Sequence, residues 1–271
     1  MPFFYIFVPH SLKPIMNLID THAHLYLPEF DADRETVIKN ALDNNITKIF
    51  LPNIDSSSIQ PMLKLVEDSP ETFYPLIGLH PTSVKENYQE ELLLVKHWLN
   101  KRKFWGIGEV GIDLYWDKTF RDQQIDAFRQ QIGLSIENSL PIVIHSRESF
   151  NDIFSVLKEF KGTPITGIFH SFTGTTSQAI MAIEMGFKIG INGIVTFKNS
   201  GLDKTVNEIG LENLVLETDS PYLAPVPRRG KRNESAYLIF IAEKIADVFL
   251  CDLHRVIDLT SQNAMEIYKI D

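Results

Sequence analysis

Short apolar runs alternate eight times with longer segments of helical apolar spacing, and this alternation restricts the possible folds more than any other feature. The runs predict strands at residues 17–21, 48–54, 73–80, 104–113, 140–147, 165–172, 187–197 and 213–221. Helical spacing is found at residues 34–45, 56–68, 89–102, 120–139, 149–160, 177–185, 204–209, 234–249 and 253–268. In the fourth of these segments, one helical stripe holds Ile125, Phe128, Ile132 and Ile136.

This alternation predicts an α/β fold in which parallel strands are joined by right-handed crossovers. Eight such units are the number that closes a (β/α)8 TIM barrel. A doubly wound open sheet is the alternative, but no glycine-rich phosphate loop follows the first apolar run, which favours the barrel. No linker, repeat or low-complexity tract divides residues 16–271, so we expect one domain there.

Residues 1–15 precede the alternating pattern and are interpreted as an N-terminal extension. Their apolar stretch, residues 3–8, is too short for the hydrophobic region of a signal peptide, and no basic residue precedes it. Met16 stands directly before the first predicted strand, so it is a possible natural start.

Composition restricts the partners and the compartment of the chain. Cys251 is the only cysteine among the 271 residues, which excludes an internal disulfide and predicts a reducing, cytoplasmic setting. No apolar run is long enough to cross a bilayer, so no membrane partner is expected, and nothing indicates an obligate protein partner. The net charge of −9 argues against broad electrostatic binding of duplex nucleic acid, but it allows a small anionic substrate or a strand end.

Histidines and carboxylates gather at the predicted carboxyl ends of the strands, where barrels of this kind hold their active sites. Side chains alternate along an extended chain, so His22 and His24 point the same way. Five of the eight histidines stand at such ends. Together with three acids they form the set His22, His24, His80, Glu109, Asp113, His145, His170 and Asp219.

Histidine and carboxylate ligands from separate strands suit zinc or manganese, and magnesium is also considered, whereas calcium prefers oxygen ligands throughout. Six candidates exceed the needs of one four-coordinate ion, so we expect two divalent metal ions held by His22, His24, Glu109, His145, His170 and Asp219. Glu109 has two oxygens and could bridge ions about 3.5–4 Å apart. One ion would take His22, His24 and Asp219, and the other His145 and His170.

Such ions lower the pKa of water to about 7, and Asp219 could accept its proton, so Glu109 and Asp219 are the predicted catalytic residues. Each residue also has a structural interpretation. The histidine pair could be ordinary polar residues of a turn, and Glu109 could be a buried acid paired with a base.

Candidate substrate contacts surround this set. A basic cluster at residues 228–233 follows Asp219, and guanidinium groups match phosphate oxygens bidentately, although charge runs are usually solvated loops. His80 could bind substrate or merely cap a loop. The predicted substrate-binding residues are His80, Asp113, Arg147, Arg229, Lys231 and Arg232.

Seven motifs, in one order from about Asn17 to the carboxyl end, resemble the TatD family of metal-dependent deoxyribonucleases among the amidohydrolase-type barrels. They are DTHAHL at 20–25, GLHP at 78–81, GIGEVGID at 106–113, PIVIHSR at 141–147, HSFTG at 170–174, LETDSPYL at 216–223 and RGKRNE at 229–234. The resemblance implies a metallo-dependent hydrolase barrel, the same six metal ligands with Glu109 shared, and cleavage of DNA, often from a 3′ end. Departures are small: Ser235 replaces a usual proline and Ile112 a usual leucine.

Three functions are therefore weighed. The first is a two-metal deoxyribonuclease that acts as a 3′–5′ exonuclease on single-stranded or frayed ends, because an acidic protein should follow duplex DNA poorly. The second is an ester or amide hydrolase such as an aminoacyl-tRNA deacylase. Related barrels often bridge their metals with a modified lysine, and Glu109 in the fourth strand favours the nuclease. The third is a non-enzymatic scaffold that retains an old site.

Overall fold

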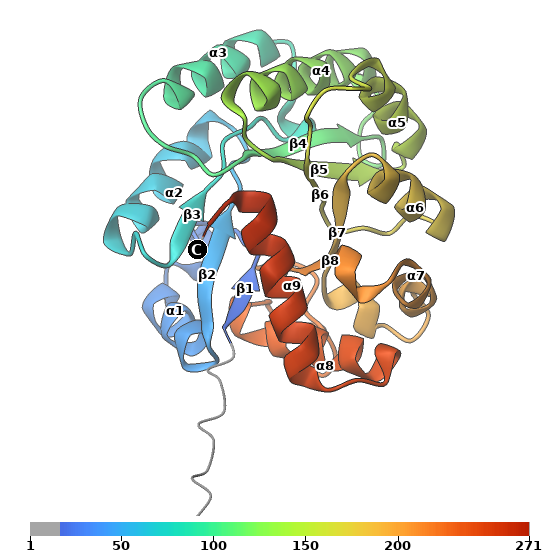
Figure 1. Cartoon of the computed structure of the whole chain (residues 1–271). Coiled ribbons are helices and arrows are strands. Elements are labelled where there is room, and N and C mark those ends of the chain that lie inside the picture. Colours follow the sequence, from blue (N-terminus) through green and yellow to red (C-terminus); the bar gives the residue numbers. More distant parts are fainter. Residues whose placement is uncertain (1–16, 271) are drawn as a thin grey trace, which may run out of the picture.

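Residues 17–270, which the computed structural model describes, alternate between strands and helices as the sequence predicts (Figure 1). The strands are β1 Leu18–Asp20, β2 Ile46–Leu51, β3 Phe73–Pro75, β4 Ile107–Asp113, β5 Ile142–Arg147, β6 Gly167–Phe169, β7 Phe187–Ile191 and β8 Leu214–Leu216. The helices are α1 Arg34–Asp43, α2 Ser56–Asp68, α3 Tyr88–Leu99, α4 Arg121–Asn138, α5 Phe150–Glu159, α6 Thr176–Glu184, α7 Leu202–Ile209, α8 Leu238–Phe249 and α9 Leu253–Tyr268. None of these helices is both long and apolar enough to cross a membrane. The interpretation of residues 1–15 as an extension, with Met16 as the start, lies outside the described residues.

Parallel pairing closes the strands into a barrel. The ladders form one sheet of β1-β2-β3 and another of β4-β5-β6-β7-β8. Backbone hydrogen bonds join the two sheets on both sides. Gly108 N donates to Ile77 O at 2.9 Å between β3 and β4, and Thr21 N donates to Leu216 O at 3.1 Å between β8 and β1. The predicted (β/α)8 barrel is therefore confirmed.

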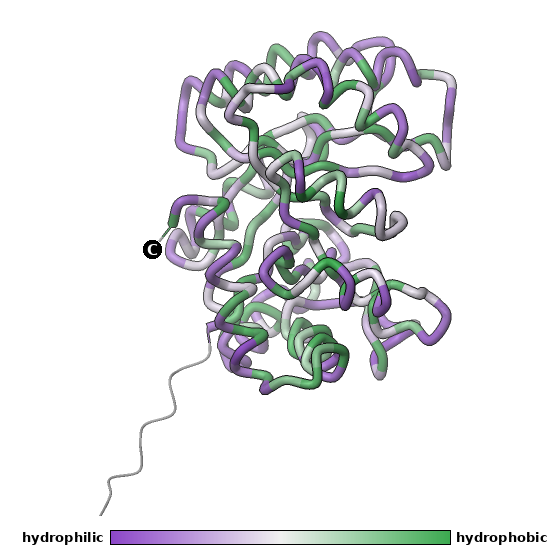
Figure 2. Tube along the Cα trace, turned by 45° about the vertical axis from the view of Figure 1, so that its right-hand side comes forward, coloured by the Kyte–Doolittle hydropathy of each residue, from purple (hydrophilic) through white to green (hydrophobic). Residues whose placement is uncertain are grey.

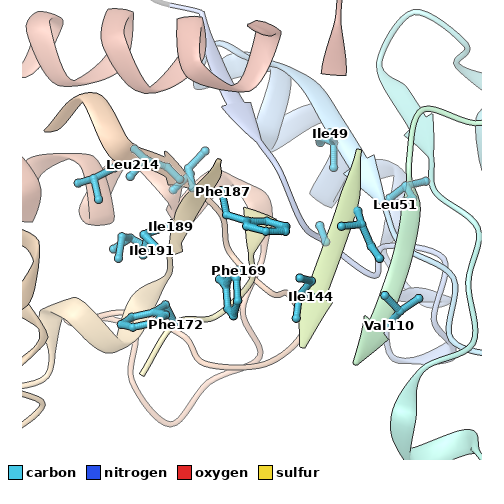
Figure 3. Packing of buried hydrophobic residues seen from close by; sticks show 14 of the residues in the cluster. Ile49, Leu51, Val110, Ile144, Phe169, Phe172, Phe187, Ile189, Ile191 and Leu214 are labelled. Atoms are coloured by element: carbon cyan, nitrogen blue, oxygen red, sulfur yellow. The ribbon is translucent and has the colours of Figure 1, made fainter. Parts of the chain in front are cut away.

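The main hydrophobic core lies between the strands and the surrounding helices. In Figure 2, hydrophobic and hydrophilic residues alternate along the outer helices, as expected for helices that pack one face against a core. In Figure 3, Phe169 of β6 packs among Ile144, Phe187 and Ile189 of the neighbouring strands. On the helix side, Phe128 and Ile132 of the stripe predicted in α4 are fully buried. Each large buried side chain of this kind contributes roughly 1.5–3 kcal/mol to folding.

Helix α9 covers the amino ends of the strands (Figure 1). The ring of Tyr268 stacks on Phe50 with centroids 3.6 Å apart. Ser261 Oγ donates to Asn17 O at 2.9 Å, and Asn263 Nδ2 donates to Leu214 O at 2.7 Å. The amino end of the barrel is thus filled, which leaves the carboxyl end for a site.

Six strands end earlier than the sequence predicts, three of them by five residues or more. The expected strands at 73–80, 187–197 and 213–221 stop at Pro75, Ile191 and Leu216. Polar side chains then bend the chain: His80 Nδ1 accepts from Thr82 N at 3.2 Å, and Asn192 Oδ1 accepts from Ile194 N at 3.1 Å. Each contact begins a short 3-10 helix, at residues 81–83 and 193–196. Local capping therefore turns the chain inside the runs 73–80 and 187–197 although their apolar pattern continues.

Close contact between β4 and β5 generates a stability prediction. Gly111 has φ +138°, and a Cβ there would lie 2.0 Å from His145 O. We expect Gly111→Ala to lower the free energy of unfolding by at least about 1–3 kcal/mol, measured by urea denaturation. Gly133 in α4 is the matched control, because a Cβ there meets nothing within 4 Å. Gly133→Ala should raise stability by about 0.5–1 kcal/mol, and equal effects of the two changes would contradict the packing argument.

Candidate metal centre

The chain after β1 and the chain after β8 bring three candidate ligands together. Asp219 N donates to His22 O at 2.9 Å, and His24 N donates to Ser220 O at 2.7 Å. The two imidazoles turn toward each other, with their Nε2 atoms 3.2 Å apart. Asp219 Oδ1 lies 3.8 Å from His22 Nε2 and 3.7 Å from His24 Nε2. Side chains almost 200 positions apart in sequence therefore surround one point.

Glu109 lies between two groups of imidazoles. It is 2% exposed, on β4. Its Oε2 is 3.1 Å from His22 Nε2. Its Oε1 is 2.8 Å from His145 Nδ1 and 3.4 Å from His80 Nε2. One carboxylate thus offers one oxygen to each side, which is the arrangement that a bridging ligand needs.

His170, after β6, completes the set. Its ring stacks on His22 with centroids 3.4 Å apart and 17° between the planes. Its Nε2 lies 3.7 Å from Asp219 Oδ1 and 3.8 Å from Glu109 Oε1. All six side chains that the sequence nominates as ligands therefore converge at the carboxyl end of the barrel.

Three groups among the described residues could each hold a metal ion, since their ligand atoms lie within 4.8 Å of one another. They are His22, His24 and Asp219; His22, Glu109 and His170; and His80, Glu109 and His145. This donor set of imidazoles and carboxylates suits divalent transition metals. The first group equals the one expected for the first ion. The expected pairing of His145 with His170 is not among these groups. His80, whose Nε2 lies 3.4 Å from Glu109 Oε1, joins His145 instead.

Burial and neighbouring charge perturb these groups strongly. Burial raises the pKa of Glu109, but His80, His22 and His170 outweigh it and hold that pKa well below its ordinary value. Burial raises the pKa of Asp219 to about 7. Burial also lowers the pKa of His145, but hydrogen bonds to Asp113 and Glu109 reverse this and raise it to about 9. Such opposed shifts are typical of functional sites.

Sequence reasoning missed Glu217 as a member of the site. Its carboxylate is fully buried, with Oε1 3.1 Å from His170 Nδ1, and it accepts a hydrogen bond from Ser171 N at 2.5 Å. Room for it comes from Gly190 on β7, where a Cβ would lie 2.6 Å from the carboxylate. The signal in the sequence is position, because Glu217 lies in the predicted strand 213–221, two residues before the nominated ligand Asp219.

Asp20 is a second missed residue. It is 0% exposed, and its Oδ2 accepts from Thr218 Oγ1 at 2.6 Å. Its Oδ1 accepts from Thr218 N at 2.9 Å and from His22 N at 3.3 Å. This acid therefore fixes the first histidine loop against the loop of Asp219.

A cavity of about 750 Å³ opens above the cluster. The predicted substrate contacts that line it are His80, Asp113 and Arg147, whereas Arg229, Lys231 and Arg232 are not among the lining residues. Arg232 instead binds Asp33 through Nη1 at 2.8 Å and Nη2 at 2.7 Å. Its guanidinium therefore joins the last loop to the start of α1, and direct substrate binding by the basic cluster stays a prediction.

The chain is similar to one known family along nearly its whole length. A model of the TatD related DNase family matches residues 19–269. The chain belongs to this family. The uncharacterized metal-dependent hydrolase YabD of Bacillus subtilis is 37% identical over 255 residues, which cover 94% of this chain and 100% of YabD. The uncharacterized metal-dependent hydrolase YjjV of Escherichia coli K12 is 30% identical and covers 89% of this chain and 92% of its own length.

Solved structures agree with the fold. The crystal structure of YjjV, a TatD homolog from Escherichia coli, superposes with a TM-score of 0.89 at 25% identity, covering 95% of this chain and 100% of that chain. A TatD family hydrolase from Entamoeba histolytica has a TM-score of 0.81 at 23% identity, covering 94% and 99%. The predicted family and the metallo-dependent hydrolase barrel are confirmed. The family and the His/Glu/Asp groups together support metal-dependent hydrolysis.

Glu217 generates a prediction about metal retention. We expect Glu217→Gln to weaken the affinity for Zn²⁺ or Mn²⁺ by about 10–100-fold, because the amide no longer fixes His170 as a carboxylate does. Affinity is measured by competition with a chromophoric chelator. Glu208→Gln, the same change at an exposed position of α7, should have no effect. Equal affinities for the two variants would show that Glu217 does not support the site.

Metal binding is also expected to depend on pH. A carboxyl must be ionised and a histidine neutral to bind a cation. The pKa of Asp219 is about 7 and that of His145 about 9, so lowering the pH protonates both and weakens binding. Affinity should rise with pH through 7 and toward 9, by up to about tenfold per pH unit for each proton released. Calorimetry in buffers of different ionisation enthalpy counts those protons, and a constant affinity from pH 6 to 8 would contradict the assignment.

Proposed function

We propose that this protein is a two-metal deoxyribonuclease that removes nucleotides from the 3′ end of single-stranded or frayed DNA. The observation that carries the proposal is the position of Glu109. Its two oxygens face separate groups of imidazoles, 3.1 Å from His22 and 2.8 Å from His145, at the base of a cavity of about 750 Å³. Two ions that share one carboxylate are typical of enzymes that hydrolyse phosphate esters. The family name supports DNA as the substrate.

The first ion would be held by His22, His24 and Asp219, the second by His145 with His80 or His170, and Glu109 would bridge them. Zinc and manganese suit these ligands, and magnesium is the further candidate. Bound ions supply a water of lowered pKa and offset negative charge on the phosphate.

Asp219 would orient the attacking water and accept its proton, because its carboxylate lies 3.8 Å from His22 Nε2 and 3.7 Å from His24 Nε2 and lines the cavity. The water oxygen bonds to phosphorus while the bond between phosphorus and the 3′ oxygen breaks. The leaving oxygen takes up a proton from solvent and becomes the new 3′ hydroxyl, and a nucleotide 5′-monophosphate is released. Arg147, at the cavity wall, binds a phosphate oxygen through its guanidinium.

The charge of the molecule supports a strand end as the substrate. The chain carries −9, so broad attraction to a duplex backbone is weak. Arg147 lines the cavity with a permanent positive charge at the carboxyl end of the barrel, and bound divalent cations would add to it there. A single strand end that enters this cavity meets those charges without a long duplex contact.

The test is degradation of oligonucleotides labelled at either end, with added magnesium, manganese or zinc. Wild type should shorten single strands from the 3′ end faster than blunt duplexes. Glu109→Gln and Asp219→Asn should each lower the rate by at least about 100-fold, since they remove a metal ligand or a proton acceptor. Asparagine tolerates the left-handed φ of +58° at position 219, so Asp219→Asn tests the carboxylate without added backbone strain.

The exposed Glu208→Gln variant should degrade DNA like wild type. Undiminished cleavage by Glu109→Gln would falsify the nuclease assignment to this site. Faster hydrolysis of aminoacylated RNA than of any oligonucleotide would instead favour the ester hydrolase that the sequence leaves open.

A further inference from the structure

Trp116 projects from the loop after β4 with 71% of its surface exposed, and it lines the cavity above the metal cluster. A large aromatic side chain left in water contributes little to folding, and Tyr115, which is 48% exposed and in contact with Trp116, extends it to a contiguous aromatic surface of the kind that marks binding sites. Tyr222, which is 49% exposed, lines the same cavity from the loop after β8. β4 and β8 are four strands apart in an eight-stranded barrel, so the two rings rise from opposite sides of the mouth.

Two neighbouring side chains, Arg147 and Tyr115, hold Trp116 in place. Arg147 at the end of β5 places its guanidinium 3.7 Å from the ring centroid of Tyr115 and 5.3 Å from that of Trp116. The two aromatic rings meet edge to face at 4.8 Å. Arg147 therefore braces the loop while it lines the cavity, and the Trp116 ring stays open to solvent.

Asp113 connects this aromatic loop to the metal cluster. Its Oδ2 lies 2.8 Å from His145 Nε2, and its Oδ1 accepts a hydrogen bond from Tyr115 N at 3.0 Å. Its own backbone N–H donates to the Gln124 side chain at 2.9 Å. The buried Asp113 carboxylate thus fixes the orientation of the His145 ring and also the position of the first residues of the loop that carries Trp116. The distance between the loop and the cluster is fixed by these bonds.

We propose that Trp116 is a stacking platform for an unpaired nucleobase of the strand whose phosphate reaches the metal cluster. This inference rests on the proposed function, and it names Trp116 as the residue that selects substrates with an unpaired base. A flat, exposed indole beside a guanidinium is the combination that binds a base face and its phosphate. Bases inside a duplex have both faces covered by their neighbours, so a base free to stack on Trp116 belongs to a single strand or a frayed end. The preference for ends then has a structural cause besides net charge.

The test compares two small phosphodiesters, one with a nucleoside and one with a methyl group in its place: the p-nitrophenyl ester of thymidine 5′-monophosphate and methyl p-nitrophenyl phosphate. With the metal-loaded enzyme, Trp116→Ala should lower kcat/KM for the thymidine ester by at least about fivefold, the loss expected for one stacked base. The methyl ester has no base to stack, so its kcat/KM should change by less than about twofold, a difference within experimental scatter. Trp116→Phe, which keeps an aromatic face, should restore most of the loss.

A binding measurement without cleavage separates this proposal from the reaction itself. An oligonucleotide with 2-aminopurine at its 3′ end is titrated into Glu109→Gln protein, and stacking on Trp116 quenches its fluorescence. Adding Trp116→Ala should weaken binding at least about fivefold and remove the protein-dependent quenching. Leu93→Ala is the control, because Leu93 is 64% exposed on α3 and does not line the cavity.

The outcomes are distinguishable. If wild type cleaves neither ester yet quenches 2-aminopurine through Trp116, the base site stands and the proposed reaction fails. If both esters are cleaved and Trp116→Ala changes them equally or not at all, the reaction stands and the platform is wrong. Because Trp116 is mostly exposed, its replacement should leave thermal unfolding unchanged, and a lowered Tm would reveal a structural role that overturns the assignment.

Discussion

The backbone hydrogen bond from Asp219 N to His22 O is the contact on which the candidate site depends most. It joins the loop after the first strand to the loop after the last, so it forms only when the barrel closes. Asp20 strengthens the same junction through Thr218. The ligands at the two ends of the sequence therefore reach one point because the sheet is cyclic, and an open sheet with the same strands would leave them at opposite edges.

The second constraint is electrostatic: several carboxylates and imidazoles are buried together at the carboxyl end of the barrel. An ionised carboxylate is costly to bury unless other charges or donors compensate. Glu109 stays ionised because imidazoles surround both of its oxygens, whereas Asp219 and Glu217, each with a pKa of about 7, have too few donors to stay fully ionised. Divalent cations are the compensation that such a set of acids fits. The same argument places the chemistry at the unfilled end of the barrel, because α9 closes the other end.

The sequence predicts the barrel and the convergence of six ligands well, because strand–helix alternation and the common edge of parallel strands are general rules. It predicts strand ends poorly: His80 and Asn192 cap turns inside apolar runs. It also cannot reveal which carboxylate an arginine will meet. Arg232 belongs to the basic cluster at residues 228–233, but it binds Asp33, about 200 residues away in sequence. Side-chain partners of that kind depend on tertiary contacts that no local pattern encodes.

The contact between Gly190 and Glu217 extends the site to a strand that supplies no ligand. A methyl group at position 190 would occupy the space of the carboxylate that lies against His170. Which residues position 190 of β7 can accept is therefore limited by the His170 and Glu217 side chains, which follow β6 and β8. In a scan of inactivating substitutions, position 190 should therefore tolerate as few replacements as a ligand position does, although Gly190 has no side chain that could contact a substrate.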